Sequence, residues 1–123
     1  MELTEGTKFD QNKIRLELLS PWFVEEVGKV LTSGAHKYDD HNWAKGIKAS
    51  RLIGACLRHV FAYMRGEVND PEWNYHHLAH AACCLMFLVH QDLTGFYKAY
   101  DDMPEWENLP NDKIIEKGIS RCR

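Results

Sequence analysis

Apolar residues recur at helical spacing in three stretches of the chain, whereas no stretch shows the period-two alternation typical of a half-buried strand. The first stretch covers about residues 21–33. A Ser-Pro pair precedes it, with Ser20 suited to cap a helix and Pro21 to occupy its first turn. Gly34 follows where a C-terminal cap belongs. The pattern therefore predicts a first helix with defined ends.

The second and third stretches predict two further helices joined by a short connector. One helix extends from Ser50, its expected N-cap, to about Arg65, and the other from residue 72 or 73 to about Leu93. A glycine follows each helix, and the connector GEVNDPEW contains the Gly, Asn-Asp and Pro residues of a turn. A connector of this length makes the two helices antiparallel neighbours.

All 123 residues fit one domain with an all-α fold. We expect a small helical bundle with a central antiparallel helix pair, an irregular arm at residues 1–20, and a tail at residues 96–123 with one short helix near 112–118. The third helix is apolar nearly all round, so it is expected to be the central one. One layer of three helices covers too little of it, and a homo-oligomer, a dimer at least, is therefore predicted.

Composition narrows the range of functions. The formal net charge is −3, so bulk electrostatics do not favour binding to nucleic acid. No apolar run is long enough to span a bilayer and the N-terminus has no apolar signal core, so we expect no membrane association and a cytoplasmic location. The cysteines show no CxxC spacing, and Cys56, Cys83 and Cys84 are expected to be small buried hydrophobic residues.

Histidines and carboxylates gather at one end of the predicted helix pair. His77 and His80 lie one turn apart, and the connector brings Glu67 and Asp70 to the same end, with His59 about two turns away on the second helix. Carboxylates and imidazoles at this density suit a divalent cation. The alternative is structural: Asp70 caps a turn and the histidines bond to the backbone at a helix start.

The loop GAHKYDDHNW and one arginine are suited to a nucleotide. Lys37 can neutralise phosphate, Tyr38 or Trp43 can stack on a base, and Asn42 can read a base edge. The guanidinium of Arg58 could clamp a phosphate oxygen. The alternatives are that Tyr38 and Trp43 close the end of the bundle as core residues, and that Arg58 belongs to a solvated helix face.

Three stretches taken together resemble a family of phage and prophage proteins. They are GTKFDQNK, GAHKYDDHNW and RHVFAYMRGEVNDPEWNYHHLAHAACCLMFL, which occur in this order within about residues 6–92. The family is that of the dATP/dGTP diphosphohydrolase N-terminal domains, relatives of the MazZ proteins. The resemblance implies a bundle similar to the MazG-like nucleoside triphosphate pyrophosphohydrolases, which cleave between the α and β phosphates with Mg²⁺ or Mn²⁺.

The resemblance also implies roles for individual residues. MazG-like enzymes hold metal with ExxE and ExxD motifs on facing helices, whereas here the second helix has no ExxE, and His77 and His80 stand at the matching positions of the third. Histidine suits Mn²⁺ or another transition metal better than Mg²⁺. The expected metal ligands are Glu67, Asp70, His77 and His80. The expected catalytic residues are Glu67, Asp70 and Arg58, and the expected nucleotide-binding residues are Lys37, Tyr38, Asn42, Trp43, Arg58 and His59.

Two functions follow from these observations. The first is a metal-dependent pyrophosphohydrolase that converts a purine deoxynucleoside triphosphate to the monophosphate and pyrophosphate; its expected partners are this small-molecule nucleotide and further copies of itself. The second is a non-catalytic phage protein that sequesters a nucleotide or signalling nucleotide, which the missing ExxE motif favours. A phosphohydrolase of the HD type is disfavoured because the chain has no adjacent His-Asp pair.

Overall fold

The computed structural model, which describes residues 2–95 and 97–105, contains three long α-helices. The predicted short helix at 112–118 lies outside these residues. No strand occurs among the residues described, so the expectation of an all-α fold is confirmed, and no helix among them is long and apolar enough to cross a membrane. The long helices are α1 (Pro21–Lys37), α2 (Ala49–Met64) and α3 (His77–Leu93); the short ones are η1 (Leu16–Leu18), η2 (Asn42–Lys45) and α4 (Tyr97–Tyr100).

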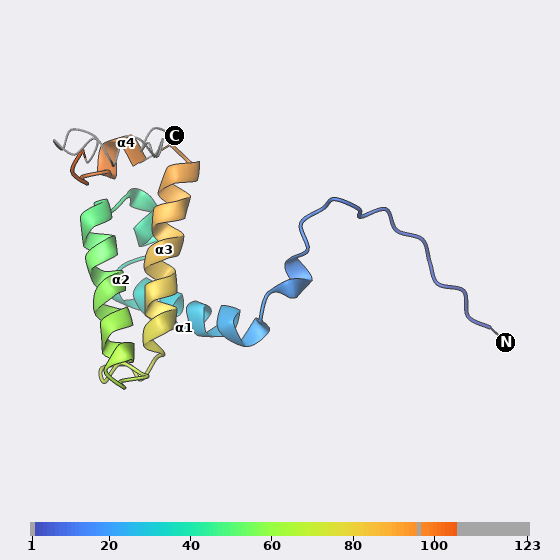
Figure 1. Ribbon diagram of the computed structural model, residues 1–123, viewed down its shortest axis with the longest axis horizontal. Coiled ribbons are helices and arrows are strands. Elements are labelled where there is room, and N and C mark those ends of the chain that lie inside the picture. Colours follow the sequence, from blue (N-terminus) through green and yellow to red (C-terminus); the bar gives the residue numbers. More distant parts are fainter. Residues whose placement is uncertain (1, 96, 106–123) are drawn as a thin grey trace, which may run out of the picture.

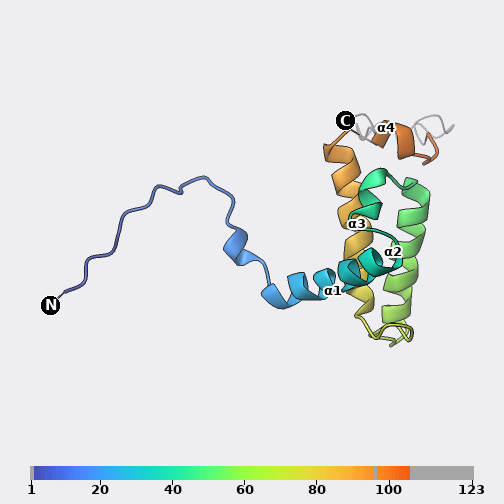
Figure 2. The same cartoon turned by 180° about the vertical axis from the view of Figure 1, so that it is seen from behind.

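Helices α2 and α3 lie side by side and antiparallel, with their connector at one end and α4 at the other (Figure 1). Helix α1 crosses this pair and packs against α3 through its C-terminal half (Figure 2). The N-terminal half of α1 and the arm at residues 2–20 extend away from the pair, and no residue of that arm is buried. The crossing of α1 over α3 creates the surroundings of the candidate site.

The start of α1 agrees with the sequence, but its end does not. The backbone N–H of Phe23 donates to Ser20 Oγ at 3.3 Å, so Ser20 caps the helix and Pro21 occupies its first position as predicted. The helix passes through Gly34 and ends at Lys37, where the Tyr38 N–H donates to the Gly34 carbonyl oxygen at 2.9 Å. The predicted stop at Gly34 is therefore wrong, because this glycine has ordinary helical geometry.

Ser50 does not cap α2, contrary to the prediction from sequence. The helix begins at Ala49, and Lys48, which precedes it, makes no side-chain capping bond. The N–H of Ser50 donates to Asp102 Oδ1 at 2.8 Å, and its hydroxyl donates to the other oxygen of the same carboxylate. A residue far along the chain thus satisfies the helix N-terminus, which local sequence could not reveal.

Helix α3 begins at His77, four to five residues later than predicted. The carboxylate of Asp70 accepts the N–H groups of Glu72 and Trp73 at 3.0 and 2.7 Å and folds this stretch into a turn. Asn74 has a φ of 60°, which no residue inside a right-handed helix adopts. The helix then starts behind His76, whose Nδ1 accepts the Leu78 N–H at 3.0 Å.

Small side chains form the contact between α2 and α3. Cys56, Ala81 and Cys84 make a buried cluster, and Cys83 is buried on the side of α3 that meets α1, with its Sγ 3.8 Å from the Val27 carbonyl oxygen. The expectation that these three cysteines are buried hydrophobic residues is confirmed. Burial raises the pKa of Cys83 to about 12, so its thiol is not reactive at neutral pH. Because the interface consists of small residues, the two helices approach closely.

Candidate functional site

A chain of three hydrogen-bonded side chains runs from the connector into the helix pair. Glu67 Oε1 lies 2.6 Å from His77 Nε2, and His77 Nδ1 lies 2.8 Å from Nδ1 of His59 on α2. His77 is buried, with 5% of its surface exposed, whereas the Glu67 side chain is 52% exposed. The imidazole of His77 thus uses both ring nitrogens to link a carboxylate at the surface to His59.

A second carboxylate–imidazole pair lies alongside the first. Asp70 Oδ2 lies 2.9 Å from His80 Nε2 and also accepts the Tyr75 N–H at 3.0 Å. The ring of His80 stacks on that of His59, with centroids 4.4 Å apart and planes inclined by 5°. The two pairs therefore meet at this imidazole stack.

The surroundings of these groups shift two pKa values. Burial, followed by the charges of His80 and His77, lowers the pKa of His59 to about 4, so this imidazole is neutral at physiological pH. Burial alone would raise the pKa of Asp70, but the Trp73 N–H, the His80 imidazole and the Tyr75 N–H together outweigh it and lower the pKa to about 2. Asp70 is thus ionised under all ordinary conditions.

The four expected metal ligands come together, but they bond to one another. Glu67 pairs with His77 and Asp70 pairs with His80, while three backbone N–H groups occupy the remaining acceptor positions of Asp70. No three His, Cys, Asp or Glu side chains within residues 2–95 and 97–105 are placed to hold one ion. This arrangement does not fit a resident Mg²⁺ or Mn²⁺.

The imidazole stack lines a hollow of about 380 Å³ between α1 and the connector, which we call the polar hollow. Lys37 and Tyr38 border it from the end of α1, and the Lys37 Nζ lies 5.3 Å from the centre of the Tyr38 ring. On the wall, the hydroxyl groups of Ser33 and Tyr75 are hydrogen-bonded to each other at 2.8 Å. A cation and two imidazoles thus face one cavity, whose lining also includes the carboxylates of Asp70 and Glu72.

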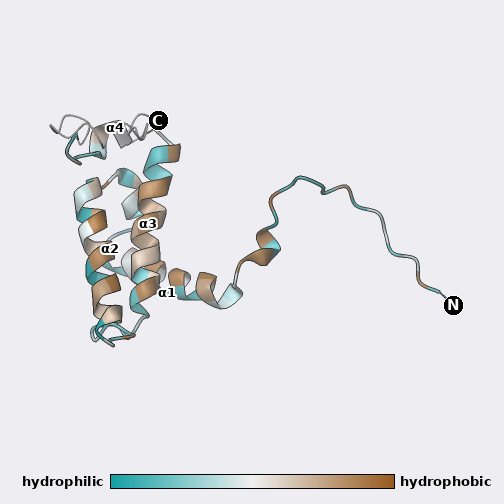
Figure 3. Ribbon diagram, in the orientation of Figure 1, coloured by the Kyte–Doolittle hydropathy of each residue, from teal (hydrophilic) through white to brown (hydrophobic). Residues whose placement is uncertain are grey.

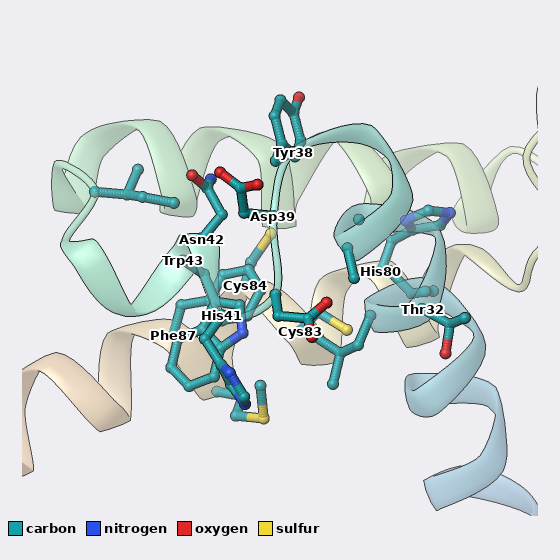
Figure 4. A pocket seen from close by; sticks show the side chains of 17 residues that line it. Thr32, Tyr38, Asp39, His41, Asn42, Trp43, His80, Cys83, Cys84 and Phe87 are labelled. Atoms are coloured by element: carbon teal, nitrogen blue, oxygen red, sulfur yellow. The ribbon is translucent and has the colours of Figure 1, made fainter.

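A second hollow of about 540 Å³, which we call the apolar hollow, lies between α1, η2 and α3 (Figure 4). Asn42 and Trp43 line it, and His80 lies at the opposite end from Phe87. The rings of Trp43 and Phe87 are stacked, with centroids 5.0 Å apart and planes inclined by 12°. The rings of Trp43 and His90 meet edge-to-face, with centroids 4.8 Å apart. One face of the indole is therefore engaged in packing while the residue also borders the cavity.

Arg58 is not brought to the two hollows. Its side chain is exposed, its guanidinium lies beside Gly54 on the same helix, and it lines neither cavity. The structure therefore separates Arg58 from the phosphate clamp that the sequence pattern suggested, while Lys37 and His59 share the polar hollow.

Several lining residues were not singled out from the sequence. Ser33 and Gly34 lie inside α1, but the pattern was interpreted as a helix end there. Trp73 and Tyr75 lie at the end of the turn around Asp70; the sequence predicted this turn, but the predicted helix included both residues. Asn74 is the signal that could have extended the turn, because asparagine tolerates the left-handed backbone conformation that it adopts here.

These features define an all-α domain with two neighbouring hollows and a hydrogen-bonded imidazole cluster, which together form the candidate site. The chain belongs to the family described as dATP/dGTP diphosphohydrolase, N-terminal, whose model matches residues 4–103. The resemblance seen in the sequence is thereby confirmed.

One relative places the family in context. A dATP/dGTP diphosphohydrolase of Salmonella phage PMBT28 is 47% identical to this chain over 83 residues, which are 68% of this chain and 28% of the relative. The chain thus spans little more than a quarter of that protein's length. No solved structure matches the chain significantly.

Proposed function

We propose that this domain binds a purine deoxynucleoside triphosphate and hydrolyses it to the monophosphate and pyrophosphate. The observation that carries the proposal is the polar hollow, where Lys37 and the stacked imidazoles of His59 and His80 face one cavity of about 380 Å³. Membership of the family and the activity for which the phage relative is named supply the substrate class. The phosphates would occupy this hollow, because it combines a cation with hydrogen-bonding nitrogens.

The chain from Glu67 to His59 has two proton arrangements that differ by one proton. With His77 neutral, its Nε2–H donates to Glu67, its Nδ1 accepts from His59 Nδ1–H, and His59 Nε2 is an acceptor. With His77 charged, both of its N–H groups donate, and His59 Nε2 carries a proton. The first arrangement accepts a proton from water, and the second donates to a phosphate oxygen.

These arrangements suit the proposed hydrolysis. A water molecule attacks a phosphorus atom of the α–β linkage while His59 Nε2 accepts one of its protons. The P–O bond of the linkage breaks, so that one product is the monophosphate and the other pyrophosphate. Glu67 lies next to His77 and stabilises the charge that the imidazole chain gains. Lys37 offsets the negative charge of the phosphates.

The metal dependence and the MazG-like character of the bundle belong to this proposal and rest on sequence resemblance. Because Glu67, Asp70, His77 and His80 already satisfy one another, we propose that Mg²⁺ or Mn²⁺ comes with the triphosphate instead of residing in the free protein. A cation bound to the triphosphate would supply electrostatic stabilisation of the leaving pyrophosphate.

A second candidate function is nucleotide sequestration without hydrolysis. The observation that favours it is the engagement of both carboxylates, since Asp70 accepts three backbone N–H groups and pairs with His80. Such a carboxylate organises structure and is poorly placed to activate water. In this case the imidazoles and Lys37 would hold phosphate and release no product.

Product analysis distinguishes the two functions. Purified protein is mixed with dATP or dGTP and Mn²⁺, and monophosphate and pyrophosphate are measured for the wild type, His59→Gln and His36→Gln. His36 is an exposed residue of α1 that lines neither hollow, so it is the matched control. The proposal expects the wild type and His36→Gln to release monophosphate and pyrophosphate in equal amounts and at the same rate. His59→Gln should release them at least a hundredfold more slowly. Tight nucleotide binding without product would identify sequestration.

A further inference from the structure

The polar and apolar hollows adjoin, and we infer that they form one elongated site in which the apolar hollow holds the purine base and the sugar passes Gly34. This inference rests on the proposed function, because the polar hollow must hold the phosphates. Val30, Gly34, Tyr38 and His80 line both hollows, so the two hollows meet at these four residues. Each volume is within the range of about 300–1,000 Å³ that is usual for small-molecule sites.

Gly34 provides the space at the junction. It lies in α1 with ordinary helical geometry, so no backbone requirement explains a glycine there. A Cβ atom built at this position meets no atom within 4 Å, which means that the helix surface facing both hollows is open. A sugar connecting a base on one side to phosphates on the other could pass at this point without displacing a side chain.

The position of the cation along the site sets the direction of the nucleotide. Lys37 and His59 line the polar hollow alone, together with the carboxylates of Asp70 and Glu72, whereas the lining of the apolar hollow includes Asp39 and Asp40 but, among the residues described, no lysine or arginine. Asp39 lies 3.6 Å from Lys45 Nζ and remains 75% exposed, so its carboxylate keeps much of its acceptor capacity. Phosphate therefore meets a cation only in the polar hollow, where the Asp70 carboxylate is already engaged by His80 and three backbone N–H groups, whereas the carboxylates of the apolar hollow can accept hydrogen bonds from the N–H groups of a base.

The lining of the apolar hollow suits a purine in particular. Its interior is formed by aliphatic and aromatic side chains, including Phe87, which offer dispersion contact to a flat ring system. At the same end, Asn42 carries an amide that can pair with two adjacent positions of an adenine edge, and the carboxylates can accept from the N–H donors of guanine. The chemistry therefore favours an adenine or guanine base over an anion in this hollow.

Three substitutions in α1 test the inference by titration calorimetry with dGTP and with inorganic tripolyphosphate. Gly34→Leu fills the junction, and Ala35→Leu fills the apolar hollow alone. Gly28→Leu is the control, because Gly28 lies in the same helix, has equally open surroundings and lines neither hollow. Circular dichroism checks that each variant is folded, which is expected because leucine favours a helix more than glycine does and nearly as much as alanine does.

The inference predicts that Gly34→Leu and Ala35→Leu each weaken dGTP binding at least tenfold. Ala35→Leu should leave tripolyphosphate binding unchanged, because it fills the base hollow alone. Gly28→Leu should change the binding of neither ligand. Unaltered dGTP binding by both folded variants would overturn the inference while the proposed function stands. If the wild type binds neither dGTP nor tripolyphosphate, the proposed function is wrong and the inference fails with it.

Discussion

His59 is the residue whose protonation most clearly links the site to the stability of the fold. Its pKa of about 4 lies below the value of about 6.5 for an unperturbed histidine. Between these pH values the unfolded chain binds more protons than the native one, so native stability decreases as the pH falls from 6.5 towards 4. We predict that the urea midpoint of the wild type falls more between pH 7.5 and 5 than that of His59→Gln. Equal decreases in both proteins would contradict the neutral state of His59.

Trp43 packs against α3, and we propose that it also contacts the base; measuring the stability and nucleotide affinity of two variants separates these roles. It packs on Phe87 and His90, so Trp43→Ala is expected to lower the melting temperature. It also borders the apolar hollow, and losing a base contact there should weaken nucleotide binding by about 1–3 kcal/mol. Trp43→Phe retains a ring against Phe87 and should retain most of both properties. If Trp43→Ala is destabilised but binds dGTP as the wild type does, Trp43 serves packing alone.

At the scale of the element, the connector between α2 and α3 depends on Asp70. This carboxylate is 8% exposed and accepts the N–H groups of Glu72, Trp73 and Tyr75. Asp70→Ala removes these acceptors, and we predict that it lowers the free energy of unfolding by roughly 3 kcal/mol. Glu72→Gln alters an exposed residue of the same turn and should change the free energy of unfolding by less than about 0.5 kcal/mol. Urea denaturation measures the free energy of unfolding of both variants. Similar values for the two variants would show that Asp70 does not hold the turn.

The sequence predicted the three long helices because their apolar periodicity is independent of tertiary contacts. It misplaced the N-terminal ends of α2 and α3, because in both places a carboxylate outside the helix accepts hydrogen bonds from the backbone. Asp102 satisfies the N-terminus of α2, and Asp70 keeps the preceding turn out of α3. The antiparallel connector was sufficient to bring Glu67 and Asp70 near His77 and His80, but their pairing depends on ring orientations that only packing determines.

At the scale of the whole molecule, many large apolar side chains are exposed, which supports our proposal of a homo-oligomer. Helix α1 carries them on the part that projects away from α3, which is largely brown in Figure 3. Trp22 is 78% exposed there, and Phe23 and Val24 are about half exposed. The outer faces of α2 and α3 carry them at helical spacing. They are Leu57, Phe61 and Met64 on α2 and Leu85, Val89 and Leu93 on α3.

We predict that the protein forms a dimer or larger assembly in solution. Light scattering at micromolar concentration should give a multiple of the 14.3 kDa chain mass. Leu85→Glu should shift the assembly towards the monomer, since it places a charge on the exposed face of α3. A wild-type protein that is monomeric under these conditions would contradict the prediction.

The central claim is that the imidazoles of the polar hollow bind the phosphates of a nucleotide, and the pH dependence of binding tests it most directly. A bound polyanion stabilises the protonated imidazole cluster, so affinity for tripolyphosphate should rise as the pH falls from 8 to 5.5. His36→Gln, titrated in parallel, accounts for protonation of the ligand itself. We predict that His59→Gln binds more weakly and gains less affinity in acid than His36→Gln. If both variants have the same affinity at every pH, the imidazole cluster is not the phosphate site.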